Sequence, residues 1–367
     1  MRVLILSSHG KPTGCCLRGR YLARALEKAG VEAKMAPPLP CLPFLTDMAL
    51  SLPLYAADAL KSSWDVIMAM KPFPNACLPA WLGRARGALF VADVDDVDYA
   101  YRDGFLSNVV RTLQKPFPRN ADLVTVHNDR LLEHVVHEFG VNEASIYRLD
   151  QGVDLDVFSP RNETPFPLEN WYIERGIEKD APILFYTAHL NVACDIQPIL
   201  RIASSVLSAS PPSNFLLAGG GPLERHCEEL CRQMLPVGRW HMTGALSPEE
   251  VALHMQRATA CLVYYEPKRA NTYRTSMKLR EYLAMGKPVA ANDVGDLAEF
   301  GAFAHLASDE AGVAEAAVSL LRGEGLNKAA QGMAYVKKNL DWSAIGLRFK
   351  EKLEEMIHRK AQKRRSP

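Results

Sequence analysis

A lysine stands near the start of a predicted helix in the stretch SMKLREYLAMGKPVAAND, residues 276–293. Ser276 suits the N-cap of this helix and Gly286 suits its end, after which an apolar strand begins. Lys278 then falls in the first turn, where the helix dipole disfavours a cation by roughly 0.3 kcal/mol or more. An anion bound at the helix start would remove this conflict, because the backbone N–H groups, the dipole and Lys278 would bind it together.

Glu281 lies one turn further along, and Lys278, Glu281 and Tyr282 are spaced to share one face of the predicted helix. The Glu281 carboxylate can accept hydrogen bonds from two hydroxyls of a sugar. A phosphate bound beside a diol describes a nucleotide sugar. The other interpretation is a surface ion pair between Lys278 and Glu281, which has the weaker order, lysine before glutamate.

Two glycine-bearing loops follow predicted strands, which is where ligands bind in open α/β sheets. SSHGKPTGCCLRGR, residues 7–20, holds His9 and Gly14 before a helix start that suits an anion. Its spacing is not GxGxxG, so it carries no dinucleotide fingerprint. AGGGPLE, residues 218–224, places Gly220 and Gly221 in a tight turn with free backbone N–H groups. Both loops are also compatible with ordinary turn chemistry.

The acidic stretch ADVDDVD, residues 92–98, leaves three interpretations open. Asp93 and Asp95, with Thr125 on the next strand, resemble the nucleophile motif of haloacid-dehalogenase-type phosphatases, and Asp-x-Asp also resembles the metal site of GT-A glycosyltransferases. Both of these would hold Mg²⁺ or Mn²⁺. The structural interpretation has the carboxylates capping a helix or pairing with Arg102. The third interpretation gives them a role in binding an acceptor substrate.

The chain has 367 residues, enough for two domains, and 48% hydrophobic and 23% charged residues are typical of a soluble globular protein. A formal charge of +1 gives no reason to expect a nucleic-acid partner. The eight cysteines show no paired CxxC spacing, so we expect reduced thiols in a cytoplasmic protein. No leader pattern precedes the first strand, and no apolar run reaches the roughly 18 residues of a membrane span.

Two apolar segments, residues 39–60 and 105–117, have two interpretations. The first is a core helix with a loop. The second is an interfacial surface that meets a lipid acceptor and makes the protein peripheral at the inner face of the membrane.

Short apolar runs alternate with amphipathic stretches along most of the chain, which predicts parallel, doubly wound sheets of an α/β protein. We expect two Rossmann-like domains that face each other across a cleft, joined by a patternless, Pro-rich linker at 158–182. The predicted limits are 1–165, 166–341, and 342–367 for a final helix with a basic tail. The predicted strands are 2–8, 32–38, 65–70, 88–94, 122–128, 145–152, 183–188, 214–221, 240–246, 260–265, 288–293 and 302–307, and predicted helices include 17–30, 196–209, 222–235 and 342–360.

The second half resembles the donor domain of the retaining GT-B glycosyltransferases of the large group 1 family. The resemblance rests on LLAGGGPLE, MTGALSPEEVALHMQRATACLVY and SMKLREYLAMGKPVAANDVGDLAE. In the first half, NADLVTVHNDRLLEHVVHEFGV and GVDLDVF are similar to the same family, and LDWSAIGLRFKEKLEEM is similar to its final helix, which crosses back to the N-terminal domain.

The resemblance implies transfer of a sugar from a nucleotide-diphosphate donor to a glycan, lipid-linked or small-molecule acceptor, with retention of configuration and without a metal or other cofactor. It places Glu281 at the donor ribose and Lys278 at the diphosphate, where Arg274 or Lys268 can assist. Lys278, Asp95 and His9 are the implied catalytic residues. The implied donor-binding residues are Gly14, His189, Gly220, Gly221, Thr243, Gly244, Arg274, Thr275, Ser276, Met277, Lys278 and Glu281.

The sequence departs from the family pattern at three places. Tyr273 stands where the family has a first glutamate against the donor sugar, and TAHLNVACDI has neither of the family's Arg and Lys, with His189 as the nearest polar residue. Asp95 and Asp96 stand where the family has His-Asp. These departures favour a second hypothesis, a catalytically weak protein that binds a nucleotide sugar.

Overall fold

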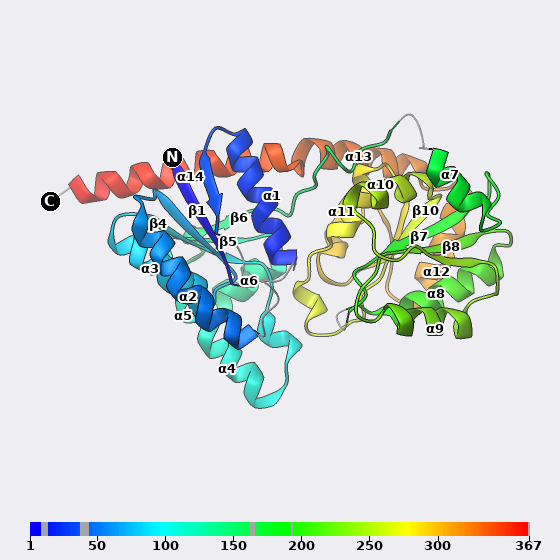
Figure 1. Ribbon diagram of the computed structural model, residues 1–367, viewed down its shortest axis with the longest axis horizontal. Coiled ribbons are helices and arrows are strands. Elements are labelled where there is room, and N and C mark those ends of the chain that lie inside the picture. Colours follow the sequence, from blue (N-terminus) through cyan, green and yellow to red (C-terminus); the bar gives the residue numbers. More distant parts are fainter. Residues whose placement is uncertain (9–13, 37–43, 162–165, 192–193, 366–367) are drawn as a thin grey trace. The chain divides into compact units, whose positions relative to one another are not determined.

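The computed structural model divides into two compact units, Met1–Gly152 with Leu340–Pro367, and Val153–Asn339 (Figure 1). It describes residues 1–8, 14–36, 44–161, 166–191 and 194–365. The chain therefore leaves unit 1 after residue 152, builds unit 2, and returns to unit 1 with its last helix.

Unit 1 is built on a six-stranded parallel sheet with the order β2-β1-β3-β4-β5-β6. The central strands are almost completely buried, as expected of a parallel sheet covered on both faces. The strands are β1 (Arg2–Ser7), β2 (Glu32–Met35), β3 (Val66–Met70), β4 (Leu89–Val94), β5 (Leu123–Val126) and β6 (Ile146–Arg148).

Two apolar clusters lie on opposite faces of this sheet. One joins the sheet to α1 (Gly14–Lys28) and α14 (Trp342–Arg365), and the other joins it to α2 (Phe44–Lys61) and α3 (Pro74–Ala85). The remaining helices of unit 1 are α4 (Gly104–Gln114), α5 (Pro116–Asn120) and α6 (Asp129–His137), with short 3₁₀ turns η1 (Asp98–Tyr101) and η2 (Glu143–Ser145).

The last helix, α14, packs closely along α1. Gly346 makes this approach possible, because a Cβ atom there would lie 2.7 Å from the backbone of Ala25. Further along, Lys350 donates to the Ala29 carbonyl at 3.1 Å and Lys360 donates to the Ala88 carbonyl at 2.7 Å. The end of the chain is thereby part of the core and edge of unit 1.

Unit 2 is a second six-stranded parallel sheet, with the order β12-β11-β10-β7-β8-β9. Counted within the unit, this is the 3-2-1-4-5-6 order of dinucleotide-binding folds, and the order reverses between β7 and β10. The strands are β7 (Ile183–Thr187), β8 (Asn214–Ala218), β9 (Trp240–Met242), β10 (Ala260–Val263), β11 (Val289–Asn292) and β12 (His305–Ala307).

Helices cover the sheet of unit 2, and one apolar cluster joins the sheet to α8, α9 and α12. The helices are α7 (Phe166–Ile173), α8 (Ile196–Ala209), α9 (Glu224–Met234), α10 (Pro248–Arg257), α11 (Met277–Ala284), α12 (Glu310–Leu321) and α13 (Leu326–Asn339). Short 3₁₀ turns η3 (Asn271–Tyr273) and η4 (Gly295–Phe300) flank α11 in the sequence.

The predicted α/β class with two doubly wound parallel sheets is confirmed, and each predicted strand is present, most of them shorter than predicted. Part of the predicted strand 32–38 lies outside the described residues. The prediction of a patternless linker at 158–182 is wrong, because α7 lies within it. Tyr172 of α7 is buried against His254, and its hydroxyl bonds the ring nitrogen Nδ1 at 2.9 Å.

Unit 2 also begins earlier than the predicted limit at residue 166, at Val153. Arg161 explains this difference, because its backbone N–H donates to the Gln256 side chain at 2.9 Å and its carbonyl accepts from the same side chain at 2.9 Å. These two bonds attach the segment after residue 153 to α10 of unit 2.

Candidate functional site

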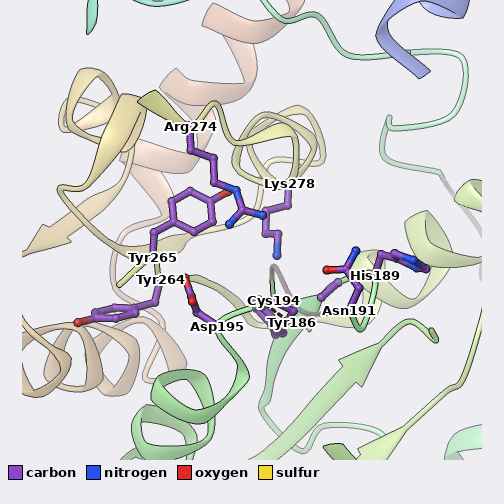
Figure 2. A pocket seen from close by; sticks show the side chains of 10 residues that line it. Tyr186, His189, Asn191, Cys194, Asp195, Tyr264, Tyr265, Arg274 and Lys278 are labelled. Carbon is purple, nitrogen blue, oxygen red and sulfur yellow. Dashed lines mark hydrogen bonds between the residues drawn. The ribbon is translucent and has the colours of Figure 1, made fainter. Parts of the chain in front are cut away.

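A pocket of about 180 Å³ opens in unit 2 at the point where the strand order reverses (Figure 2). Ligands of open α/β sheets bind at this place because the loops after the two strands diverge there. One wall comes from the loop after β7 and the other from the segment after β10. The lining residues are Tyr186, Ala188, His189, Asn191, Cys194, Asp195, Tyr264, Tyr265, Arg274 and Lys278.

The start of α11 is fixed by a buried ion pair. Arg280 donates to Asp296 at 2.6 Å and to the Ser276 carbonyl at 2.9 Å, and both charged side chains are inaccessible to solvent. The other Asp296 oxygen accepts from the Ser276 N–H at 3.0 Å. Ser276 is the N-cap, as predicted, and its hydroxyl accepts from the Leu279 N–H at 3.2 Å.

These bonds determine which helix-start N–H groups can meet an anion. The first N–H groups of a helix have no partner within the helix. Asp296 accepts a hydrogen bond from the Ser276 N–H, and the Ser276 hydroxyl accepts one from the Leu279 N–H. The N–H groups of Met277 and Lys278 remain, so a phosphate at this end would meet these two and not Ser276.

The Lys278 side chain lies over an aromatic ring. Its Nζ lies 4.1 Å from the centre of the Tyr186 ring, a cation–π arrangement. Burial lowers the pKa of Lys278 to about 8. Arg274 lies beside it, with its guanidinium carbon 4.6 Å from the centre of the Tyr265 ring. Two cations therefore line one side of the pocket, which suits an anionic ligand.

Glu281 is half-buried, and burial raises its pKa to about 7. Within the described chain no ion pair joins it to Lys278, so the interpretation as a surface pair is wrong. Tyr282 does not share a face with them as predicted. It is fully buried, and its hydroxyl accepts from the Thr187 N–H at 3.0 Å, which attaches α11 to the end of β7.

The glycine loop after β8 approaches the chain's own backbone. Gly219 has φ of +139°, and a Cβ there would lie 1.9 Å from the Ala188 carbonyl oxygen. The Gly219 N–H donates to the Thr243 hydroxyl at 3.2 Å, and Gly219 pairs with Gly244 in an isolated bridge. These contacts tie the loops after β7, β8 and β9 together. Gly220, Gly221, Thr243 and Gly244 do not line the pocket, so their predicted contact with the donor stays a prediction.

Sequence reasoning missed several of the residues that line the pocket. Asp195 is the main omission. It stands directly before α8, where an aspartate in a sequence is usually interpreted as an N-cap. Tyr186, Tyr264 and Tyr265 end buried strands, where an aromatic residue usually reads as core. Their common signal is position, because β7 and β10 flank the reversal of strand order, and that order is not visible before the sheet is assembled.

Unit 1 has an ionic cluster at the corresponding end of its sheet, where its own strand order reverses between β1 and β3. Lys71 has φ of +63°, uncommon for a residue with a side chain, and its ammonium lies 2.6 Å from Asp98 and 3.7 Å from Asp95. Burial raises the pKa of Asp95 to about 7. Asp95 and Asp98 pair with Lys71, and among the described residues no ion pair joins them to Arg102, the partner that the structural interpretation expected. Strain of this kind is often found at functional sites.

Asp93 is closed to solvent. Arg18, itself buried, contacts its two oxygens at 3.2 and 3.3 Å, and the Thr125 hydroxyl donates to it at 2.6 Å. Arg18 also donates to the Leu149 carbonyl at 2.7 Å, which joins α1, β4 and the segment after β6. This burial disfavours the phosphatase interpretation, which needs Asp93 to reach substrate.

The other predicted residues are placed as follows. His9 lies outside the described residues, and Gly14 begins α1. His189 and Arg274 line the pocket, and Lys268 pairs with Asp195 at 3.1 Å and also contacts Glu266. In the part of the chain that is described, no group of three His, Cys, Asp or Glu side chains could hold a metal ion, and no helix is long and apolar enough to cross a membrane.

Comparison with known proteins finds a family match for part of the chain. Residues 181–323 match the family model described as glycosyl transferases group 1. A curated relative, the putative teichuronic acid biosynthesis glycosyltransferase TuaH of Bacillus subtilis, is 22% identical over 192 residues, 52% of this chain and 45% of that protein. The chain thus spans less than half the length of this relative.

Solved structures match nearly the whole chain. Sucrose-phosphate synthase from Thermosynechococcus elongatus gives a TM-score of 0.78 at 18% identity, covering 98% of this chain and 99% of that one. Anabaena HepE in complex with UDP and glucose gives a TM-score of 0.74 at 15% identity, covering 97% and 100%. The chain has the GT-B fold of these proteins, and its residues 181–323 match the model of the group 1 glycosyl transferases.

We predict that Lys278→Met stabilises unit 2. The pKa of Lys278 is about 8 in the folded protein, below its usual value, so the unfolded chain binds more protons between about pH 8 and 10.5. The stability of the unchanged protein should therefore rise with pH across that window. Lys278→Met should raise the free energy of unfolding by about 1 kcal/mol at pH 7 and remove this rise.

Thermal unfolding followed at several pH values checks this prediction. Lys337→Met is the matched control, since Lys337 is exposed on α13, and it should leave the pH dependence unchanged. Equal stability of Lys278→Met and the unchanged protein at pH 7, with the same pH dependence, would show that Lys278 carries no cost of burial.

Proposed function

We propose that the protein is a glycosyltransferase that moves a sugar from a nucleotide-diphosphate donor to a glycan or lipid-linked acceptor, with retention of configuration and without a metal. The observation that carries the proposal is the cationic side of the pocket at the strand reversal. Lys278 and Arg274 line a space of about 180 Å³ there, and Lys278 lies in the first turn of α11, which begins at Met277.

This arrangement suits the charge that develops in sugar transfer. The bond between the anomeric carbon and the diphosphate breaks, and the diphosphate leaves with both electrons. Fixed cations and helix-start N–H groups stabilise that developing charge without reorganising at the moment of reaction. In a retaining transfer the acceptor oxygen bonds the same face of the anomeric carbon, and its proton passes to the leaving phosphate.

Two further residues receive roles by the same reasoning. Glu281, one turn after Lys278, has no ion pair within the described part of the chain, and its carboxyl suits the two hydroxyls of the donor ribose. Asp95, with a pKa of about 7, suits the hydroxyl of an acceptor, and Lys71 keeps it in place. His9 keeps its predicted part in positioning that hydroxyl.

The relatives support a nucleotide-sugar donor and leave the acceptor open. HepE was solved with UDP, with UDP and glucose, and with UDP-glucose. Sucrose-phosphate synthase and the teichuronic acid enzyme are named for different products. The nucleotide end of the donor is therefore the better supported part of the proposal.

The departures from the family pattern favour one alternative, a protein that binds a nucleotide sugar and turns it over weakly. Tyr273 in place of a glutamate and the absence of Arg and Lys from residues 187–196 are the observations behind it. Binding and turnover measurements separate the two functions.

Lys278→Ala should weaken the affinity for a nucleoside diphosphate by about 1.5–3 kcal/mol, the usual effect of losing a charge-assisted hydrogen bond. Calorimetric titration with UDP, GDP and ADP measures this, using whichever binds the unchanged protein. Lys337→Ala, on the exposed face of α13, is the control and should bind normally. An unchanged dissociation constant for Lys278→Ala would refute the phosphate role.

Turnover of the donor should persist in EDTA. The assay follows release of nucleoside diphosphate from the matching glucose donor, with and without an extract of glycans and lipids as acceptor pool. Loss of turnover on chelation would overturn the metal-free mechanism. Tight nucleotide binding with no turnover against any acceptor would favour the binding protein.

We further propose that unit 1 contacts the membrane surface where a lipid-linked acceptor resides. Apolar side chains are exposed on helices that the sequence predicted as either core or interfacial. Phe105 and Leu106 at the start of α4 are 80% and 58% exposed, beside the exposed Arg102. Leu50 and Leu54 on α2 and Trp81 on α3 are exposed on two helices that pack together. Exposed apolar side chains next to a cation, as at Phe105 and Arg102, suit an anionic bilayer.

The double change Phe105→Ser and Leu106→Ser should reduce sedimentation with phosphatidylglycerol vesicles at least fivefold, because it removes two adjacent, exposed apolar side chains. Val237→Ser is the control, since Val237 is 95% exposed in unit 2. Equal sedimentation of the double variant and the unchanged protein, or none for either, would remove α4 from the proposed contact.

A further inference from the structure

Among the described residues that line the pocket, one carries a carboxylate, and it is not at the position where the family has its glutamate. Tyr273 stands where group 1 proteins have a glutamate, and Tyr273 is not part of the lining. Asp195, on the loop after β7, lines the pocket from the other wall. Figure 2 shows its carboxylate and the Lys278 ammonium both turned toward the opening.

We propose that Asp195 binds hydroxyl groups of the transferred sugar. This inference rests on the proposed function, because it assigns the part of the donor that lies beyond the diphosphate. It also narrows the substrate class to donors with an uncharged, hydroxyl-bearing sugar.

The first argument is that the Asp195 side chain does not cap the helix that follows it. It occupies the N-cap position of α8, where an aspartate normally accepts a backbone N–H of the first turn and stabilises the helix by about 1 kcal/mol. Its side chain makes no such bond. It is turned instead toward the segment after β10, which forms the wall of the pocket that also carries Arg274 and Lys278.

The second argument is that the carboxylate is held firmly but not saturated. Its Oδ2 accepts from Asn271 at 2.9 Å and from the Glu266 N–H at 3.3 Å, and its Oδ1 accepts from Lys268 at 3.1 Å. A carboxylate has about four acceptor positions, so Oδ1 keeps one for a ligand. The side chain is 11% exposed, and that exposure is toward the pocket it lines.

The third argument is the charge state. Burial by itself would raise the pKa of Asp195, but hydrogen bonds from Lys268 and Asn271 outweigh it and lower the pKa. The group is therefore ionised at neutral pH and accepts hydrogen bonds only. Sugar hydroxyls are donors, so they match it.

The walls of the pocket complete the match. Tyr186 and Tyr265 also line the pocket, and their rings hold the Lys278 and Arg274 cations in place. Cations stand on one wall for the diphosphate, and an anion stands on the other for the hydroxyls. A sugar that carries its own carboxylate would meet Asp195 with like charge, which disfavours it.

Titration calorimetry of Asp195→Asn tests the inference. The probes are UDP, GDP and ADP, then the glucose derivative and the glucuronate derivative of whichever binds. Asp195→Asn should bind the nucleoside diphosphate within twofold of the unchanged protein. It should bind the glucose derivative at least tenfold more weakly, and its preference for glucose over glucuronate should shrink by a similar factor.

Two ligands and one control variant separate recognition from loop structure. Asp180→Asn, on the exposed surface of unit 2, should behave as the unchanged protein. If Asp195→Asn weakens binding of the nucleoside diphosphate as much as that of its glucose derivative, or leaves the preference for glucose over glucuronate unchanged, Asp195 only holds the loop and does not bind the sugar.

The outcomes also distinguish this inference from the function on which it rests. If no nucleoside diphosphate binds the unchanged protein, the proposed function fails. If one binds, and Asp195→Asn binds its glucose derivative normally, only the role of Asp195 fails.

Discussion

The buried ion pair between Arg280 and Asp296 is the constraint on which the site in unit 2 depends. It fixes the start of α11 by bonding both the N–H and the carbonyl of Ser276, the N-cap residue. Breaking one partner of such a pair costs roughly 3–5 kcal/mol, because a buried charge is left unpaired. The pair also occupies the N-cap N–H, so that the free donors at this helix start are those of the next two residues. Lys278 is one of these two residues, and its side chain lines the pocket.

Strand order explains why each unit gathers ionic side chains where it does. In both sheets the order reverses once, and the loops on either side of the reversal diverge. In unit 2 the opening holds Lys278, Arg274 and Asp195. In unit 1 the same position holds Lys71, in a left-handed conformation, with Asp95. The first set suits a nucleotide sugar, and the second suits a neutral acceptor group.

The sequence was sufficient for the fold, because the signals involved are local. Apolar runs between amphipathic stretches predict strands and helices, and α8 has the predicted limits. The helix α7 was missed because its apolar positions follow no helical period and its stability comes from distant contacts with α10. Lys278 and its N-cap were predictable from helix rules. The role of Asp195 could not be predicted in this way. Asp195 is the N-cap residue of α8, but its side chain does not cap the helix, and only the folded structure shows this. Tyr282 was placed on the wrong face for a similar reason, since its partner at Thr187 is far away in the sequence.

A crystal structure of the protein with a bound nucleoside diphosphate tests the central claim most directly. The account predicts that diphosphate oxygens lie within hydrogen-bond distance of the backbone nitrogens of Met277 and Lys278 and of the Lys278 ammonium, with the Ser276 nitrogen still bonded to Asp296. A diphosphate bound elsewhere in unit 2, with Lys278 still lying over the ring of Tyr186, would contradict it.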